Sequence, residues 1–182
     1  ISLNKFDTIV ISHDEGGMSR SMYYSSVLKL DLGMFYKRRD YTRIENGKNP
    51  IVAHEYLGRD VSNKDVIIVD DMISSGESII DVATNLKKHG AKRIFVFTTF
   101  GLFCNGLEVF DEAYTNGVVD KIFTTNLIYR NPGLKNRDWY CEVDMSKYIS
   151  LLIDTLNHDE TISKLLDPVV KIQNLVNKLE NK

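Results

Sequence analysis

The feature that most constrains this chain is an apolar run that ends in two adjacent carboxylates. Val66–Val69 contains four apolar residues, most of them β-branched, and Asp70 and Asp71 follow directly. An apolar run without polar alternation predicts a buried strand of a parallel sheet. A short Ser/Gly segment then leads into an amphipathic helix expected over about residues 76–89. The sequence therefore predicts a strand, a turn and a helix, with polar groups gathered at the turn.

This turn has the chemistry of a sugar-phosphate site. The backbone N–H groups and the positive dipole end at a helix start favour a phosphate, and the hydroxyls of Ser74, Ser75 and Ser78 would add donors. The carboxylates of Asp70 and Asp71 repel phosphate but accept hydrogen bonds, which suits sugar hydroxyls. The two acids could instead only end a strand, but the Ser-Ser-Gly segment that follows them favours ligand binding.

The rest of the chain alternates short β-branched runs with helical patterns. This alternation predicts an α/β fold with a parallel sheet and helices on both faces. Further strands are expected at Thr8–Ser12, Met34–Lys37, Ile94–Thr98 and Lys121–Thr124, with a hairpin strand at Ile51–Tyr56. The polar segment over residues 38–49, closed by Pro50, predicts a mobile loop.

Helical spacing predicts which side chains face inward. In a helix that ends before Gly33, the expected inward face is Met18, Met22, Tyr23, Val27 and Leu30. In the helix after the two acids, the expected inward residues are Ile79, Ala83 and Leu86, and Gly90 is the expected residue just beyond the helix end.

We expect one α/β domain over residues 1–143 and a helical extension over residues 144–182 that packs on it. A chain of 182 residues with 43% hydrophobic content can bury one substantial core. Helices are expected at Asp144–Leu156 and after Pro168, where apolar residues recur at Val169, Ile172, Val176 and Leu179. The last helix is interpreted as docking on its own domain, with a subunit contact as the alternative.

Composition excludes several classes of function. A net charge of -2 gives no global basic footprint, so binding of nucleic acid by overall charge is not expected. Cys104 and Cys141 lack a metal-type spacing and fit reduced thiols in the cytoplasm. No apolar run approaches the ~20 residues that span a bilayer, so no membrane contact is expected.

Two more motifs accompany the acidic turn. Ile9–Gly17 reads as a strand followed by a Ser-His-Asp-Glu-Gly-Gly turn, and Tyr36–Arg39 ends in Lys-Arg-Arg. In this order, the three motifs resemble the ribose-phosphate diphosphokinases, which make phosphoribosyl diphosphate and have a type I phosphoribosyltransferase-like fold. Gly90–Ile94 and Phe123–Asn126 are similar to the family's next strand entries, so the resemblance covers roughly residues 8–163.

The resemblance implies a role for each motif. Lys37 and Arg39 would be catalytic, because cations on a closing loop stabilise the charge on a transferring diphosphoryl group. Asp70 and Asp71 would bind the ribose, and Asp14 would hold Mg²⁺. The 5-phosphate would be held by Ser74, Ser75, Gly76, Glu77 and Ser78.

The implied reaction transfers diphosphate from Mg·ATP to the 1-hydroxyl of ribose 5-phosphate and serves nucleotide biosynthesis. The resemblance implies a cytoplasmic homo-oligomer when the protein is full length, with no nucleic acid or membrane partner. The chain begins at Ile1, so the family's amino-terminal half, with most of the ATP site, is expected to be absent and this chain alone to be inactive.

Three departures from the family keep alternatives open. His13 replaces a usual Pro and is interpreted as a local hydrogen-bonding residue. Ser74 stands where many members have an acid, and Glu77 where they have a small residue, so the local charge is roughly unchanged. The alternatives are a type I phosphoribosyltransferase, or a non-catalytic regulatory homologue that binds nucleotide or phosphate. Arg130, Asn131 and the Arg137–Trp139 segment follow a strand end and are interpreted as a solvated loop, with an adenine or subunit contact as the alternative.

Overall fold

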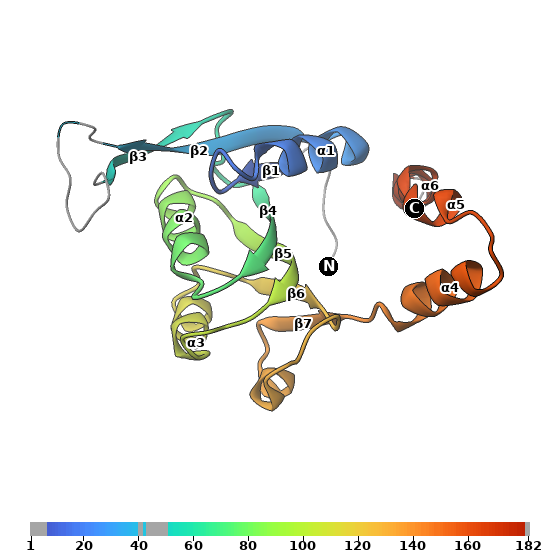
Figure 1. Cartoon of the computed structure of the whole chain (residues 1–182). Coiled ribbons are helices and arrows are strands. Elements are labelled where there is room, and N and C mark those ends of the chain that lie inside the picture. Colours follow the sequence, from blue (N-terminus) through green and yellow to red (C-terminus); the bar gives the residue numbers. More distant parts are fainter. Residues whose placement is uncertain (1–6, 40–41, 43–50, 181–182) are drawn as a thin grey trace.

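The strands form one seven-stranded sheet in a computed structural model (Figure 1). The structure describes residues 7–39, 42 and 51–180, without the side chains of residues 37–39, 51–54, 179 and 180. The sheet order is β3-β2-β1-β4-β5-β6-β7, and every neighbouring pair is parallel except β2 and β3. The strands are β1 (Thr8–Ser12), β2 (Asp31–Arg39), β3 (Ile51–Leu57), β4 (Asp65–Ile73), β5 (Arg93–Gly101), β6 (Lys121–Thr125) and β7 (Tyr140–Val143). The expected α/β class is confirmed.

Helices cover both faces of the sheet, as expected. On one face lie α2 (Glu77–Lys88) and α3 (Glu108–Thr115), and on the other lies α1 (Met18–Leu28) (Figure 1). The chain continues through the 3₁₀ helix η2 (Pro132–Asn136) to α4 (Ser146–Asn157), α5 (Ser163–Leu166) and α6 (Val169–Glu180). None of the described helices is long and apolar enough to cross a membrane.

The core explains why β4 lies near the middle of the sheet. Val66 and Ile68 belong to the larger apolar cluster with the inward residues of α2, while Ile67 and Val69 belong to a smaller cluster that includes Tyr24 of α1. Because successive side chains of a strand point to opposite faces, both faces of β4 must be apolar to be covered. The predicted inward residues of α2, Ile79, Ala83 and Leu86, are all buried, and Gly90 follows the helix at φ +86° as expected.

The predicted inward face of α1 is only partly correct. Val27 is buried and Leu30 packs against the smaller cluster, as predicted. However, Met22 and Tyr23 are 55% and 41% exposed, and Ser21 is buried. Tyr24 supplies the aromatic contact with the sheet. The helix carries apolar residues on two sides, so its sequence alone did not determine which side contacts the sheet.

Several strand ends also differ from the prediction. The backbone of β2 continues as strand to Arg39, so Arg39 lies in a strand and not in the expected loop, whereas Lys37 lies in a strand as predicted. Similarly, β4 extends through Asp70 and Asp71 to Ile73. Neither α3 nor β7 was predicted, because both are short and contain polar residues. Most of the expected mobile loop, at residues 40, 41 and 43–49, lies outside the described residues.

The carboxyl-terminal helices associate unevenly with the rest of the molecule. The last helix, α6, contacts α1. Neither α4 nor the described part of α6 has a buried residue, and the Ile153 side chain of α4 is 63% exposed. The division into residues 1–143 and 144–182 stays a prediction.

Candidate functional site

Polar motifs that lie far apart in the sequence come together at the carboxyl edge of the sheet. Asp14 follows β1, Asp70 and Asp71 lie in the last part of β4, and α2 begins at Glu77. Adjacent parallel strands end at the same edge, and β1 pairs directly with β4. In open α/β sheets this edge is where ligands bind.

The two carboxylates of the acidic pair share one guanidinium. Arg20 in the first turn of α1 donates from Nη1 to Asp70 Oδ1 at 2.9 Å, and its Nη2 lies 3.2 Å from Asp71 Oδ2. The Asp70 side chain is only 10% exposed, whereas that of Asp71 is 60% exposed. Asp71 is therefore the more accessible carboxylate, and Asp70 is held inside the edge.

The pKa values of the pair shift in opposite directions. Burial raises the pKa of Asp70 above its ordinary value, despite the opposing effect of the His13 charge. Hydrogen bonding with Asp70 lowers the pKa of Asp71, and the nearby charge of Arg20 adds to this effect. Asp71 is thus the member of the pair that most readily stays ionised.

His13 links the acidic pair to Asp14. Its Nε2 atom lies 3.3 Å from Asp14 Oδ2 and 3.4 Å from Asp70 Oδ2. The other ring nitrogen is buried and has no hydrogen-bond partner among the described residues. The local hydrogen-bonding role expected for His13 agrees with this position.

Asp14 has the donor chemistry that a magnesium ion needs, but not a closed cage. Its Oδ1 accepts a hydrogen bond from Gly17 N at 2.9 Å, and its side chain is 35% exposed. The described residues contain no cluster of three or more His, Cys, Asp or Glu side chains that could hold a metal ion. Mg²⁺ often takes only one or two protein carboxylates and completes its shell with water and phosphate oxygens. Asp14 fits an ion of that kind.

The segment over residues 74–78 forms a turn and the first turn of α2. Gly76 is the N-cap residue with φ +88°, and no side chain caps the helix there. A Cβ at Gly76 would lie 2.1 Å from Phe110 Cζ, so both the backbone angle and the packing require glycine. Ser74, Glu77 and Ser78 are exposed. An uncapped, exposed helix start of this kind can accept an anion.

A second segment supports this turn. Cys104 N donates to the carbonyl of Ser74 at 2.9 Å, and Ser74 Oγ lies 3.7 Å from Cys104 Sγ. Leu102 N donates to the carbonyl of Ile73 at 2.9 Å. Cys104 is an exposed free thiol. The segment after β5 therefore fixes the carbonyl side of the turn.

The predicted catalytic cations are placed only by their backbone. Lys37 and Arg39 pair with His54 and Ile51 of β3, with a register irregularity between Arg38 and Arg39. The strand pair projects beyond the body of the sheet (Figure 1). The side chains of Lys37 and Arg39 lie outside the described residues, so their catalytic role stays a prediction.

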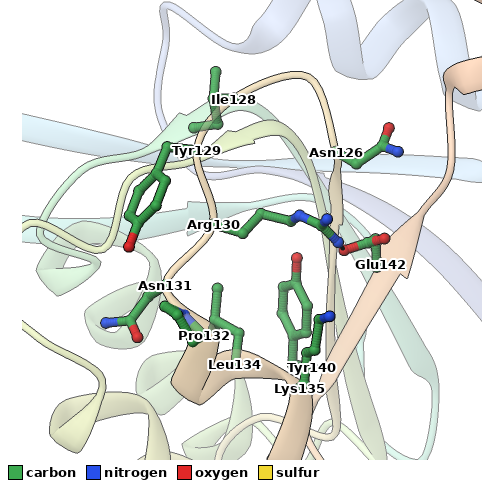
Figure 2. A pocket seen from close by; sticks show the side chains of 10 residues that line it. All are labelled: Asn126, Ile128, Tyr129, Arg130, Asn131, Pro132, Leu134, Lys135, Tyr140 and Glu142. Carbon is green, nitrogen blue, oxygen red and sulfur yellow. Dashed lines mark ion pairs between the residues drawn. The ribbon is translucent and has the colours of Figure 1, made fainter.

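A separate cavity is lined by the segment that follows β6, by η2 and by β7, and none of its lining residues belongs to the acidic pair (Figure 2). It has a volume of about 410 Å³, and Arg130 forms an ion pair with Glu142 at its wall. Tyr129 is 83% exposed. The lining residues are Asn126, Ile128, Tyr129, Arg130, Asn131, Pro132, Leu134, Lys135, Tyr140 and Glu142. The turn over residues 74–78 contributes none of them.

The interpretation of the segment Arg137–Trp139 as a solvated loop is wrong. Trp139 is 2% exposed, and its Nε1 donates to Asp111 Oδ1 at 2.7 Å. Arg137 Nη2 donates to Asp111 Oδ2 at 3.0 Å. Burial opposes ionisation of Asp111, but the hydrogen bonds from Trp139 and Arg137 outweigh it and lower the pKa of this carboxyl. The segment is anchored on α3.

The sequence interpretation missed Arg20 and Cys104 as neighbours of the site. Arg20 follows Gly16-Gly17 by three residues, so a helix starting at Met18 puts it in the first turn at the carboxyl edge. The position of Arg20 near the site could therefore have been predicted. It was missed because part of the inward face of α1 was assigned wrongly.

Comparison with known proteins identifies the relatives of this fold. Residues 2–121 match the family described as "Phosphoribosyl transferase domain". The chain is 38% identical to ribose-phosphate pyrophosphokinase of Mycoplasma pneumoniae over 69% of its own length and 37% of that protein. It is 31% identical to the protein of the same name from Shewanella oneidensis, over 86% of its own length and 47% of that protein.

A solved structure agrees with the fold. The chain matches the crystal structure of phosphoribosylpyrophosphate synthetase from Mycobacterium smegmatis with a TM-score of 0.70, at 20% identity, over 84% of this chain and 46% of that one. The chain spans less than half the length of each of these three relatives. Since the family match covers well over half of the 182 residues, the chain belongs to the phosphoribosyl transferase domain family.

Proposed function

We propose that this chain forms the ribose-phosphate-binding part of a ribose-phosphate diphosphokinase. The observation that carries the proposal is the acidic pair at the end of β4 beside the uncapped start of α2. The relatives that share this region are named ribose-phosphate pyrophosphokinase. A sugar phosphate needs both features, because its phosphate requires N–H donors and its hydroxyls require acceptors.

In this proposal one bound ligand contacts both the acidic pair and the turn over residues 74–78. The segment over residues 74–78 holds the 5-phosphate, and Asp71 and Asp70 accept the ribose hydroxyls. Asp14 holds Mg²⁺, which when bound would neutralise charge on the phosphates of ATP. Glu77 in the first turn of α2 places a negative charge near the phosphate, so the binding must come mainly from backbone amides and hydroxyls.

The chemical step is transfer of a diphosphoryl group. The 1-hydroxyl oxygen of ribose 5-phosphate attacks the β-phosphorus of ATP and loses its proton to solvent. The bond from that phosphorus to the α–β bridging oxygen breaks, and AMP leaves with that oxygen. Negative charge then grows on the leaving and equatorial oxygens. Lys37 and Arg39 are proposed to stabilise this charge, since fixed cations act most strongly where water is excluded.

An assay of AMP formation by the natural gene product tests the proposal. We expect this gene product to form AMP from ATP only when ribose 5-phosphate is present, and Lys37→Ala to lower kcat by at least 100-fold, about the effect of losing one transition-state donor. Asp154→Asn on the exposed α4 is the matched control and should leave the rate unchanged.

Two results would contradict the proposal. Consumption of phosphoribosyl diphosphate with a nucleobase would indicate a phosphoribosyltransferase. Binding of nucleotide or phosphate without AMP formation would indicate a regulatory homologue, which the Ser74 and Glu77 departures make a defined alternative.

A further inference from the structure

Arg20 occupies the centre of the acidic pair. Its two terminal nitrogens contact different carboxylates, at 2.9 Å to Asp70 and 3.2 Å to Asp71. Two adjacent residues of a strand normally direct their side chains to opposite faces. Here one planar guanidinium brings both carboxylates to the same place. The fork geometry of arginine allows this, whereas a lysine ammonium is a single point charge.

The remaining contacts of the pair fix its orientation. Asp70 Oδ1 also accepts from Asp71 N at 2.8 Å, and Asp71 Oδ1 accepts from Met72 N at 2.9 Å. Each ionised carboxylate oxygen has about two acceptor positions, so these bonds leave further positions for a ligand. Because Asp71 is 60% exposed, its free positions are open to solvent. The pair is both held in place and accessible.

The position of Arg20 is itself determined by the fold. It lies in the first turn of α1, which follows the Asp14 turn and contacts β1 and β4. Its side chain is 30% exposed and that of Asp70 is 10% exposed, so the ion pair is partly buried. Removing Arg20 would leave the Asp70 carboxylate without its charged partner, and the orientation of the acidic pair therefore depends on this contact.

We propose that Arg20 is a positioning residue that sets the sugar selectivity of the site, by holding Asp70 and Asp71 in the orientation that accepts the ribose hydroxyls. The inference rests on the proposed function, because it assumes that the acidic pair binds the sugar. Without Arg20 the two like charges repel each other, and Asp71 turns towards water. Loss of Arg20 thus affects recognition of the sugar more than recognition of the phosphate.

Calorimetric titration of this chain with three ligands tests the proposal. The ligands are ribose 5-phosphate, 2-deoxyribose 5-phosphate and inorganic phosphate. For Arg20→Gln we expect the Kd of ribose 5-phosphate to rise about tenfold, the effect of about one charge-assisted hydrogen bond. We expect the preference for ribose 5-phosphate over its 2-deoxy analogue to disappear, and the Kd of inorganic phosphate to change less than about threefold.

Two further variants separate positioning from charge and folding. Arg20→Lys keeps the charge but not the fork, so we expect it to restore only part of the sugar preference. Arg59→Gln removes an exposed arginine paired with Asp31 and should bind all three ligands like the unchanged chain.

The outcomes distinguish the two proposals. If the unchanged chain does not bind ribose 5-phosphate at millimolar concentration, the proposed function fails and this inference fails with it. If it binds, and Arg20→Gln keeps the sugar preference or loses phosphate and sugar affinity equally, only the role of Arg20 is overturned.

Discussion

Gly76 has the backbone conformation that the turn between β4 and α2 requires. Its φ of +88° lies in the left-handed region, and Phe110 packs where a side chain would begin. A residue with a Cβ must therefore strain the backbone and displace an aromatic ring of α3. The shape of the proposed phosphate loop depends on the absence of this one methyl group.

Gly76→Ala is expected to lower the free energy of unfolding by about 2–5 kcal/mol, the sum of left-handed strain and overpacking. Gly117→Ala is the matched control, because Gly117 also has positive φ, at +66°, but nothing lies within 4 Å of the position that a Cβ would occupy there. We expect that variant to lose only about 1 kcal/mol. Urea denaturation of both variants measures the difference. Equal losses would mean that Phe110 does not restrict the turn.

Asp111 shows how one carboxylate joins two elements. It lies in α3 and accepts hydrogen bonds from Arg137 and Trp139, which precede β7. Because the indole N–H of Trp139 is buried, leaving it without a hydrogen-bond acceptor would lower the free energy of unfolding by about 1–3 kcal/mol. The end of the sheet at β7 is attached to α3 through this carboxylate.

The stability contributed by Asp111 should depend on pH. Its pKa in the folded protein is below the ordinary value of 3.8, so this stability is present above that value and is lost as the pH falls through the folded-state pKa. We expect the difference in unfolding free energy between the unchanged chain and Asp111→Asn to be constant from about pH 7 to pH 5, and to shrink below about pH 4. A difference that stays constant down to about pH 3 would contradict the lowered pKa.

The elements differ in how far their sequences specify them. The β-branched run Thr8–Ser12 predicted β1 with the correct bounds, and the inward face of α2 was also correct. In both elements the apolar pattern is consistent with only one arrangement of buried side chains. By contrast, α1 has apolar residues on two sides, and only its contact with the sheet selects Tyr24 over Met22. Trp139 follows four polar residues in the sequence, and it packs against Phe103 and Phe110, which lie far from it along the chain. Its hydrogen-bond partner, Asp111, lies 28 residues away.

The candidate site, too, could be predicted from the sequence only in part. The acidic pair and the turn after it could be recognised because they are contiguous in the sequence. The partner of the pair, Arg20, is 50 residues from Asp70, and its role depends on the rotation of α1. Contacts across elements of this kind require the fold before they can be seen.

At the scale of the whole molecule, the described residues place two candidate ligand sites apart from each other. One is the edge formed by Asp14, the acidic pair and the start of α2, and the other is the cavity lined by the segment after β6 and by β7 (Figure 2). The chemistry of a sugar phosphate favours the first place, where an uncapped helix start lies beside two acceptors.

Amide chemical shifts of the isotope-labelled chain, titrated with ribose 5-phosphate, test the central claim most directly. If the sugar phosphate binds at the β4–α2 turn, the largest shifts will be those of Asp71, Gly76 and Glu77, while Tyr129 and Glu142 at the cavity stay unchanged. Saturable shifts confined to the cavity residues, with none over residues 70–78, would contradict the assignment.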